Sequence, residues 1–253
     1  MTHNTLTHNT LITRISAVSY ANTFPFLLGL DEFMEGNDFT ISRDVPSECA
    51  NKLINNEVDL GLIPVATIPQ VPNANIISDY CIGSIGKVNT VLLMSKVPFE
   101  KISKVHLDTE SRTSVNLVKV LAKKYWLKDW NYDILPIDYA SNNNVESMVL
   151  IGDKTQETLD FTYKYDLSEA WFEFTGKPFV FAAWVANKEL PLDFIKRFNE
   201  ALNKGLNNIP KSIKKYNKNI KYNLEDYLNN YISYPFDKDK KEALRLFLSY
   251  ISE

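Results

Sequence analysis

The chain has 253 residues, of which 45% are hydrophobic and 23% are charged, and its formal net charge is -3. This length and balance are typical of an ordered globular protein and suffice for one large α/β domain or two small lobes. The slightly acidic charge argues against a protein that binds nucleic acid or anionic membranes over its whole surface.

Few residues are available for disulfides or metal ligation. Two cysteines, Cys49 and Cys81, are too few for a disulfide framework, and we expect both to be buried free thiols. Two of the three histidines, His3 and His8, belong to a polar leader, so no histidine-based metal site is expected.

The N-terminal sequence, MTHNTLTHNTL, predicts a disordered leader over residues 1–11. It lacks the positive and apolar regions of a secretory signal. No run approaches the roughly 20 apolar residues that a membrane span needs. We therefore expect a cytoplasmic protein without a membrane partner, whose ordered chain begins near Ile12.

Strands and helices are expected to alternate along the ordered chain. Apolar, β-branched runs predict strands, and apolar residues at helical spacing predict helices. The expected strands are residues 12–18, 39–43, 58–64, 76–85, 91–95, 105–107, 148–151 and 178–186. The expected helices are residues 23–33, 46–56, 113–126 and 167–175, followed by a helical tail from Pro191 onward. This alternation is typical of a parallel α/β sheet.

We expect a two-lobed architecture with a central ligand cleft. Residues 12–95 and 183–253 would form the first lobe, and residues 96–182 would be inserted as the second. Ligands of open α/β sheets bind at the carboxyl ends of strands, and lobe interfaces are favoured sites. The segments that directly follow the strands are therefore the candidate binding segments.

The helical tail is rich in lysine. Its clustered lysines are Lys211, Lys214, Lys215, Lys218 and Lys221. We interpret them as the solvated face of packed helices. A nucleic-acid patch is the alternative, but the tail lacks a defined motif of interleaved aromatic residues.

The first candidate segment follows the first strand and holds Ser19, Tyr20, Asn22 and Thr23. Helix N-termini favour anions because their backbone N–H groups lack partners. Ordinary helix capping by Asn22 or Thr23 is the alternative interpretation. Another candidate, Asp153, also follows a strand and would either cap the next helix or meet a ligand hydroxyl.

Residues 108–114 join a short strand to an amphipathic helix. The hydroxyls of Ser111, Thr113 and Ser114 and the guanidinium of Arg112 suit a carboxylate bound at a helix start. A capping box with a structural arginine–acid pair is the alternative.

Residues 83–90 contain two glycines and the polar side chains of Ser84, Lys87, Asn89 and Thr90. This segment either lines a cleft or forms a loop before a strand. The signature motifs of nucleotide binding, zinc hydrolysis and serine acyl transfer are missing from the sequence. The residues alone thus indicate a binding-protein-like α/β fold with a small anionic ligand.

Six segments, in order, resemble the chorismate dehydratase family of the futalosine route to menaquinone. They are RISAVSYANTFPF (14–26), VDLGLIPVATI (58–68), VNTVLLMSKVPFEKI (88–102), LDTESRTSVNLVKVL (107–121), LIGDKT (150–155) and DLSEAWFEFTGKPFVFAAWVA (166–186). The resemblance implies a type II periplasmic-binding-protein fold and a hydro-lyase without metal or organic cofactor. Its implied reaction converts chorismate to 3-[(1-carboxyvinyl)oxy]benzoate and water.

By position, the resemblance marks Asn22 as the residue important for activity. It implies that Ser111, Thr113 and Ser114 bind an anion, facing donors near Asn89 and Thr90. Relatives often differ at Ala21 and Phe24, and the loop at Lys87 is also unusual. Whether Lys87 or Arg112 meets a given substrate carboxylate is left open.

Two alternatives to the dehydratase remain. The sister enzyme of the same route cleaves cyclic dehypoxanthinyl futalosine and relies on a histidine base. The only internal histidine here, His106, lies within an expected strand, which argues against that lyase. The other alternative is a non-catalytic solute-binding protein, since a fold alone does not fix function. In each case the partner is a small molecule, and we expect a monomer or homodimer.

Overall fold

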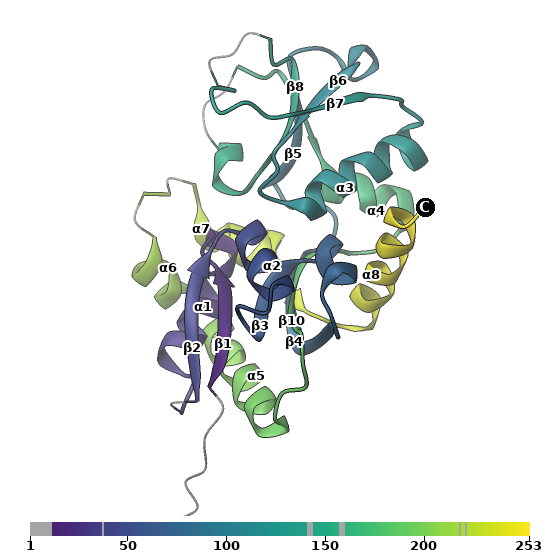
Figure 1. Ribbon diagram of the computed structural model, residues 1–253. Helices are drawn as coiled ribbons and strands as arrows, with labels where there is room; N and C mark the ends of the chain where they lie inside the picture. Colours follow the sequence, from purple (N-terminus) through teal and green to yellow (C-terminus); the bar gives the residue numbers. More distant parts are fainter. Residues whose placement is uncertain (1–11, 37, 141–143, 157–159, 218, 221) are drawn as a thin grey trace, which may run out of the picture.

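The computed structural model describes residues 12–36, 38–140, 144–156, 160–217, 219–220 and 222–253. The predicted leader, residues 1–11, lies outside these ranges. Two β-sheets stand one above the other, each with its own helices (Figure 1). The two-lobed α/β prediction is therefore confirmed.

The first sheet has six strands in the order β11-β4-β10-β3-β1-β2. Its strands are β1 (Thr13–Val18), β2 (Phe39–Asp44), β3 (Leu60–Pro64), β4 (Asn75–Ser84), β10 (Phe179–Ala186) and β11 (Ser233–Pro235). Strand β1 runs parallel to β2 and β3, as the alternating pattern predicted. Strand β10 is antiparallel to both of its neighbours, because the chain returns through it from the second lobe. The sheet is therefore mixed, not purely parallel as expected.

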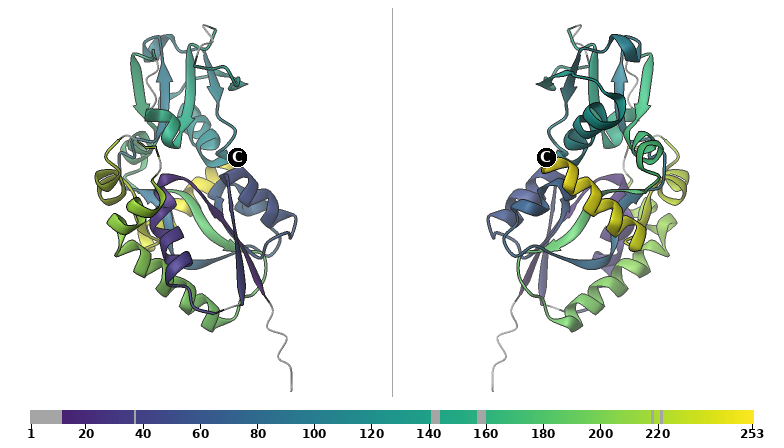
Figure 2. Two further views of the ribbon diagram at one scale, coloured as in Figure 1. Left: turned by 90° about the vertical axis from the view of Figure 1, so that its left-hand side faces the viewer. Right: turned by 90° about the vertical axis from the view of Figure 1, so that its right-hand side faces the viewer.

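Helices cover both faces of this sheet. They are α1 (Phe24–Glu32), α2 (Pro46–Ile54), α5 (Leu192–Leu206), α6 (Ile209–Tyr216), α7 (Leu224–Asp226) and α8 (Lys238–Ile251). Helices α1 and α5 lie on one face and α2 lies on the other (Figure 2). Helices α1 and α5 touch through glycines: a Cβ atom on Gly205 would lie 2.0 Å from the carbonyl oxygen of Pro25. This close approach fixes α1, and with it the loop that precedes it.

The second sheet has five strands in the order β7-β6-β8-β5-β9. Its strands are β5 (Val91–Ser95), β6 (Lys104–Leu107), β7 (Asn131–Ile134), β8 (Ser147–Ile151) and β9 (Tyr163–Asp166). Its helices are α3 (Arg112–Leu121), which continues as a wider π-helical turn through Trp126, and α4 (Leu167–Thr175). The sheet places α3 with its N-terminus toward the first lobe (Figure 1).

The strand order of the two sheets places the lobe boundaries a few residues away from the expected positions. Strand β5 belongs to the second sheet, whereas the sequence analysis placed residues up to 95 in the first lobe. Residues 179–182, expected in the second lobe, belong to β10 of the first sheet. A mostly apolar strand such as β5 is buried along its whole length, so its pattern does not indicate which sheet it joins.

Asp166 joins the start of α4 to the loop through which the chain first crosses between the lobes. Its buried carboxylate accepts hydrogen bonds from the backbone N–H groups of Val88 and Asn89, at 2.9 and 2.6 Å. It also accepts from the N–H groups of Ser168 and Glu169, at 3.0 and 3.1 Å, and so caps α4. Asn89 has left-handed backbone, with φ of 64°. The carboxylate therefore fixes the loop that leads to Thr90.

Several expectations about single residues can be compared with the structure. Cys49 and Cys81 are buried free thiols, as predicted, and burial raises the pKa of both to about 12. In the tail, Lys211, Lys214 and Lys215 are exposed, which agrees with the solvated-face interpretation, and Lys211 and Lys215 form ion pairs with Glu32. Lys218 and Lys221 lie outside the described residues. Over the described part of the chain, no helix meets the length and hydropathy of a membrane span.

Candidate functional site

A cleft of about 570 Å³, which includes space open to solvent, lies between the two lobes. This size falls in the usual range for small-molecule sites. Its lining residues are Val18, Tyr20, Asn22, Thr23, Pro46, Leu62, Pro64, Ile82, Val88, Thr90, Val91, Ser111, Ser114, Ile151, Gly152, Phe181, Ala182 and Ile232. None of these described lining residues is charged, so recognition in the cleft depends on neutral polar groups and apolar contact.

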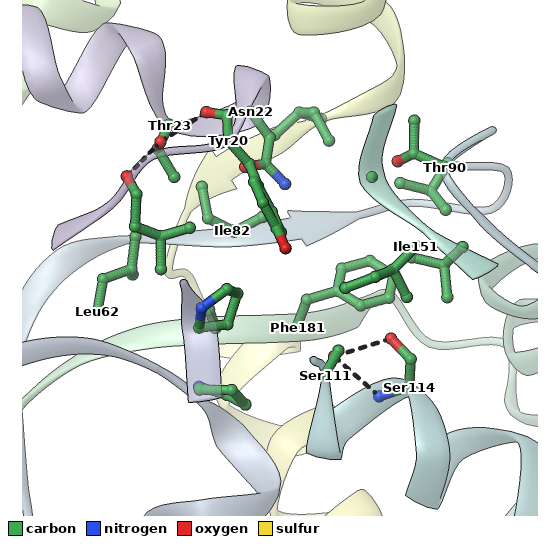
Figure 3. A pocket seen from close by; sticks show the side chains of 18 residues that line it. Tyr20, Asn22, Thr23, Leu62, Ile82, Thr90, Ser111, Ser114, Ile151 and Phe181 are labelled. Atoms are coloured by element: carbon green, nitrogen blue, oxygen red, sulfur yellow. Dashed lines mark hydrogen bonds between the residues drawn. The ribbon is translucent and has the colours of Figure 1, made fainter. Parts of the chain in front are cut away.

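Polar groups face each other across an apolar floor. Tyr20 and Asn22 lie on one side of the cleft, and Ser111 and Ser114 lie on the opposite side, with Phe181 between them (Figure 3). The first pair follows β1 in the first lobe, and the second pair opens α3 in the second lobe. A ligand held here would contact both lobes.

Asn22 is the most distinctive polar residue of the cleft. Its Oδ1 atom is buried and has no hydrogen-bond partner among the described residues. A buried polar atom without a partner costs about 1–3 kcal/mol, so such atoms often mark ligand positions. The Asn22 backbone carbonyl accepts a hydrogen bond of 2.9 Å from the phenol of Tyr234.

The capping alternative for this loop does not describe the structure. Neither Asn22 nor Thr23 makes a side-chain capping bond to α1. The Thr23 hydroxyl lies 2.7 Å from the carbonyl oxygens of both Val18 and Tyr20. Thr23 therefore shapes the turn between β1 and α1, although its side chain borders the cleft.

The start of α3 combines a cap with an open end. Ser111 is the N-cap residue: its Oγ accepts a hydrogen bond of 3.2 Å from the Ser114 N–H and lies 3.0 Å from the Ser114 hydroxyl. The other N–H groups of the first turn have no acceptor within the helix. The helix end and the two hydroxyls therefore favour an oxygen-rich, anionic ligand group.

Arg112 and Thr113, predicted at the same site, instead bridge the lobes. The Arg112 guanidinium donates to the side-chain oxygens of Asn51 and Gln70, at 2.9 and 3.4 Å. The Thr113 hydroxyl donates to the Phe181 carbonyl at 3.0 Å. Neither residue lines the cleft. The alternative interpretation of an arginine–acid pair is also wrong, because the partners of Arg112 are the neutral amides of Asn51 and Gln70.

Thr90 lines the cleft, and its hydroxyl lies 2.8 Å from the phenol of Tyr227. Asn89 lines a neighbouring cavity that meets the cleft at Thr90. Ser84 is fully buried against the Ser168 hydroxyl, at 2.5 Å. Of the residues in this predicted segment, only Thr90 therefore presents a side-chain polar group to the cleft; Lys87 is exposed outside it.

Two further predicted residues lie outside the cleft lining. Ser19 is exposed. Asp153 accepts a hydrogen bond of 2.8 Å from the Tyr222 phenol, and burial raises the pKa of its carboxyl group. Both side chains are therefore structural or solvent-facing in this arrangement.

A charged network crosses the mouth of the cleft between the lobes. The Tyr20 phenol of the first lobe donates to the Glu110 carboxylate of the second. Lys154 pairs with Glu110 at 2.9 Å and with Asp108 at 3.1 Å. Burial raises the pKa of Glu110, but hydrogen bonds from Tyr20 and Lys154 outweigh it and keep the carboxyl ionised.

Sequence reasoning did not single out Glu110 and Lys154, although both lie inside the predicted segments. The position of Glu110, directly before the N-cap residue Ser111, could have indicated that it lies near the site. The apolar floor, formed by residues such as Phe181 and Ile232, carried no signal, because core residues have the same composition. Among the described residues, no group of three histidine, cysteine, aspartate or glutamate side chains is placed to hold a metal ion.

Two α/β lobes with a cleft between them are typical of periplasmic-binding-protein-like folds. A Candida albicans gene product described as having the generic periplasmic binding protein structural fold superposes with a TM-score of 0.64, at 14% identity over 93% of this chain and 90% of its own. A crystal structure of a protein from Archaeoglobus fulgidus has a TM-score of 0.74, at 14% identity over 97% of this chain and 98% of its own. These similarities show the fold.

Sequence similarity identifies the family within this class. A family model described as menaquinone biosynthesis matches residues 13–253, and the chain belongs to that family. A chorismate dehydratase from Thermus thermophilus is 27% identical over 217 residues, which cover 75% of this chain and 76% of that protein. The resemblance drawn from the six sequence segments is thereby confirmed.

Proposed function

We propose that this protein is a chorismate dehydratase of the futalosine route, a cytoplasmic hydro-lyase that converts chorismate to 3-[(1-carboxyvinyl)oxy]benzoate and water. The observation that carries the proposal is the buried, unpartnered Asn22 Oδ1 in the cleft between the lobes. The similarity to a chorismate dehydratase directs this observation toward one substrate.

The polar groups of the cleft suit the groups of chorismate. Chorismate has one hydroxyl, which can donate, and two carboxylates, which only accept hydrogen bonds. Asn22 lines the cleft and its buried Oδ1 is an acceptor without a partner among the described residues, whereas Ser111, Ser114 and Thr90 offer hydroxyl donors. In the proposed complex, Asn22 accepts the hydrogen bond of the leaving hydroxyl, and the hydroxyls and the start of α3 hold a carboxylate.

The reaction needs little acid–base chemistry from the protein. Loss of the hydroxyl and one ring hydrogen as water makes the ring aromatic, so the driving force lies in the substrate. The cleft would hold the reactive conformer, stabilise charge and exclude water. Because no ionisable group other than the Tyr20 phenol lines the described cleft, we propose that a substrate carboxylate takes the proton.

The position of His106 favours the dehydratase over the sister lyase. Its Nδ1 atom lies 3.2 Å from the Ser147 carbonyl, where β6 pairs with β8. His106 is absent from the described cleft lining, so it is poorly placed to act as a base there.

Turnover of chorismate by the purified protein, without added metal or nucleotide, tests the proposal by liquid chromatography and mass spectrometry. We expect a product lighter than chorismate by one water. Asn22→Ala should lower turnover by at least about 100-fold, as loss of a polar transition-state contact does in other enzymes. The exposed Asn207→Ala is the matched control and should retain full turnover. Binding of chorismate without turnover would instead support a solute-binding role.

A further inference from the structure

The C-terminal segment from Tyr227 to Pro235 packs against the loop that carries Asn22. It contains a π-helical turn, Tyr227–Tyr231, and strand β11. Ile232 lines the cleft, and the Tyr234 phenol holds the backbone carbonyl of Asn22. Single π-helical turns occur frequently at functional sites. A segment about 200 residues away in the sequence thus forms part of the cleft wall.

Tyr227 interacts with two of the polar residues that line the cleft, Thr90 and Asn22. Its side chain is buried, and its phenol oxygen lies 2.8 Å from the Thr90 hydroxyl. Burial raises the pKa of this phenol, and interactions with Thr90 and with the Asn22 side chain each lower it in part. The Asn22 side chain therefore also interacts with this phenol.

A phenol donates one hydrogen bond and accepts others, so one oxygen serves both neighbours. When the Asn22 amide N–H donates to the phenol, the carbonyl Oδ1 at the other end of the carboxamide is left without a partner. That is the observed state of Oδ1. When the phenol in turn donates to Thr90 Oγ1, the Thr90 hydroxyl hydrogen is left for a group in the cleft. Successive hydrogen bonds of this kind polarise and strengthen one another.

We infer that Tyr227 is a positioning residue, which orients the Asn22 carboxamide and the Thr90 hydroxyl toward the substrate. The expected effect of Tyr227 on turnover rests on the proposed function. The orientation of the Asn22 and Thr90 side chains does not, because it is a property of the ligand-free protein. Tyr227 is not among the residues that line the cleft, so it acts through its two neighbours rather than on the substrate.

Tyr227→Phe removes only the phenol oxygen and tests the role in turnover. We expect kcat for chorismate to fall about tenfold, as loss of one buried hydrogen bond predicts, with KM changed less than about twofold. Tyr80→Phe is the matched control, because the Tyr80 phenol donates a hydrogen bond of 3.1 Å to the Asn203 side chain and neither residue lines the cleft. In an Asn22→Ala background, Tyr227→Phe should lower kcat by much less than in the wild type. An unchanged kcat, or an equal loss in both backgrounds, overturns the inference.

Thr90 supplies a second pair of variants. Thr90→Val removes the hydroxyl partner of the same phenol at nearly equal volume, and Thr90→Ser retains it. We expect kcat to fall in the first variant and to recover in the second. A loss of equal size in Thr90→Ser would contradict the role of the hydroxyl.

A measurement on the ligand-free protein separates this inference from the proposed function. The side-chain amide resonance of Asn22, assigned by its disappearance in Asn22→Ala, should shift in Tyr227→Phe and stay in place in Tyr80→Phe. A resonance that does not move in Tyr227→Phe overturns the positioning role, whether or not the protein consumes chorismate. A shifted resonance in a protein that leaves chorismate unchanged supports the positioning role and rejects the proposed function.

Discussion

The hydrogen bond from Tyr20 to Glu110 joins the lobes across the mouth of the cleft, and its removal should weaken substrate binding. Charge-assisted hydrogen bonds contribute about 1.5–3 kcal/mol, and a partly exposed acceptor such as Glu110 belongs at the lower limit. Lys154 lies in the same lobe as Glu110, so its ion pair does not depend on lobe closure. Glu110→Ala should therefore cost the closed arrangement about 1.5 kcal/mol, which corresponds to about a tenfold change in an equilibrium constant.

Steady-state kinetics with chorismate would measure this effect. We expect KM to rise about tenfold in Glu110→Ala and about threefold in Glu110→Gln, which keeps a neutral acceptor. The value of kcat should stay near that of the wild type, because saturating substrate restores closure. The exposed Glu100→Ala in the same lobe serves as the control. An unchanged KM in Glu110→Ala would refute the reasoning.

Three predictions concern stability. Burial raises the pKa of Asp59, but bonds from Arg14 and Lys188 outweigh it and hold the pKa at about 2. Because folding lowers this pKa, the ionised Asp59 carboxylate stabilises the fold by about 1–2 kcal/mol at pH values above its ordinary pKa, and this stabilisation is lost as pH falls toward 2. Denaturation of the wild type and of Asp59→Asn between about pH 5 and pH 2 should show the difference in their free energies of unfolding shrinking. A constant difference would disprove the prediction. Asp166→Ala leaves four N–H groups without their acceptor and should lower the free energy of unfolding by about 3 kcal/mol, measured by urea denaturation. Gly205→Ala forces a Cβ atom against the Pro25 carbonyl and should lower the free energy of unfolding by about 2–3 kcal/mol. Gly86→Ala has open space around the new Cβ atom but a left-handed backbone, and should lower it by about 1 kcal/mol. Equal melting temperatures for the two variants would contradict this prediction.

The central strands were predictable from the sequence, but most edge strands were not. Strands such as β3, β5 and β8 are buried along their whole length and are mostly apolar, with a single serine at one end of β5 and of β8. Strands β7, β9 and β11 lie at the edges of the two sheets and have no assigned counterpart in the sequence analysis. An edge strand is short and partly exposed, and its mixed composition resembles that of a loop. The hydrophobic pattern therefore predicts the core of each sheet better than its width.

The candidate site shows a similar division. Hydroxyls at a helix start were expected near an anion, and Ser111 and Ser114 do line the cleft. Their neighbours Arg112 and Thr113 point elsewhere, because successive residues of a helix lie about 100° apart around its axis. Tyr227 is brought to Asn22 by tertiary structure alone, and nothing in its local sequence signals that contact.

The product formed from chorismate tests the central claim most directly. Purified protein and chorismate, incubated without metal or nucleotide, should give a single product whose mass is lower by one water. Its proton NMR spectrum should show a meta-substituted aromatic ring that keeps the carboxyvinyl group. Unchanged chorismate, or a product of equal mass to the substrate, would contradict the dehydratase assignment.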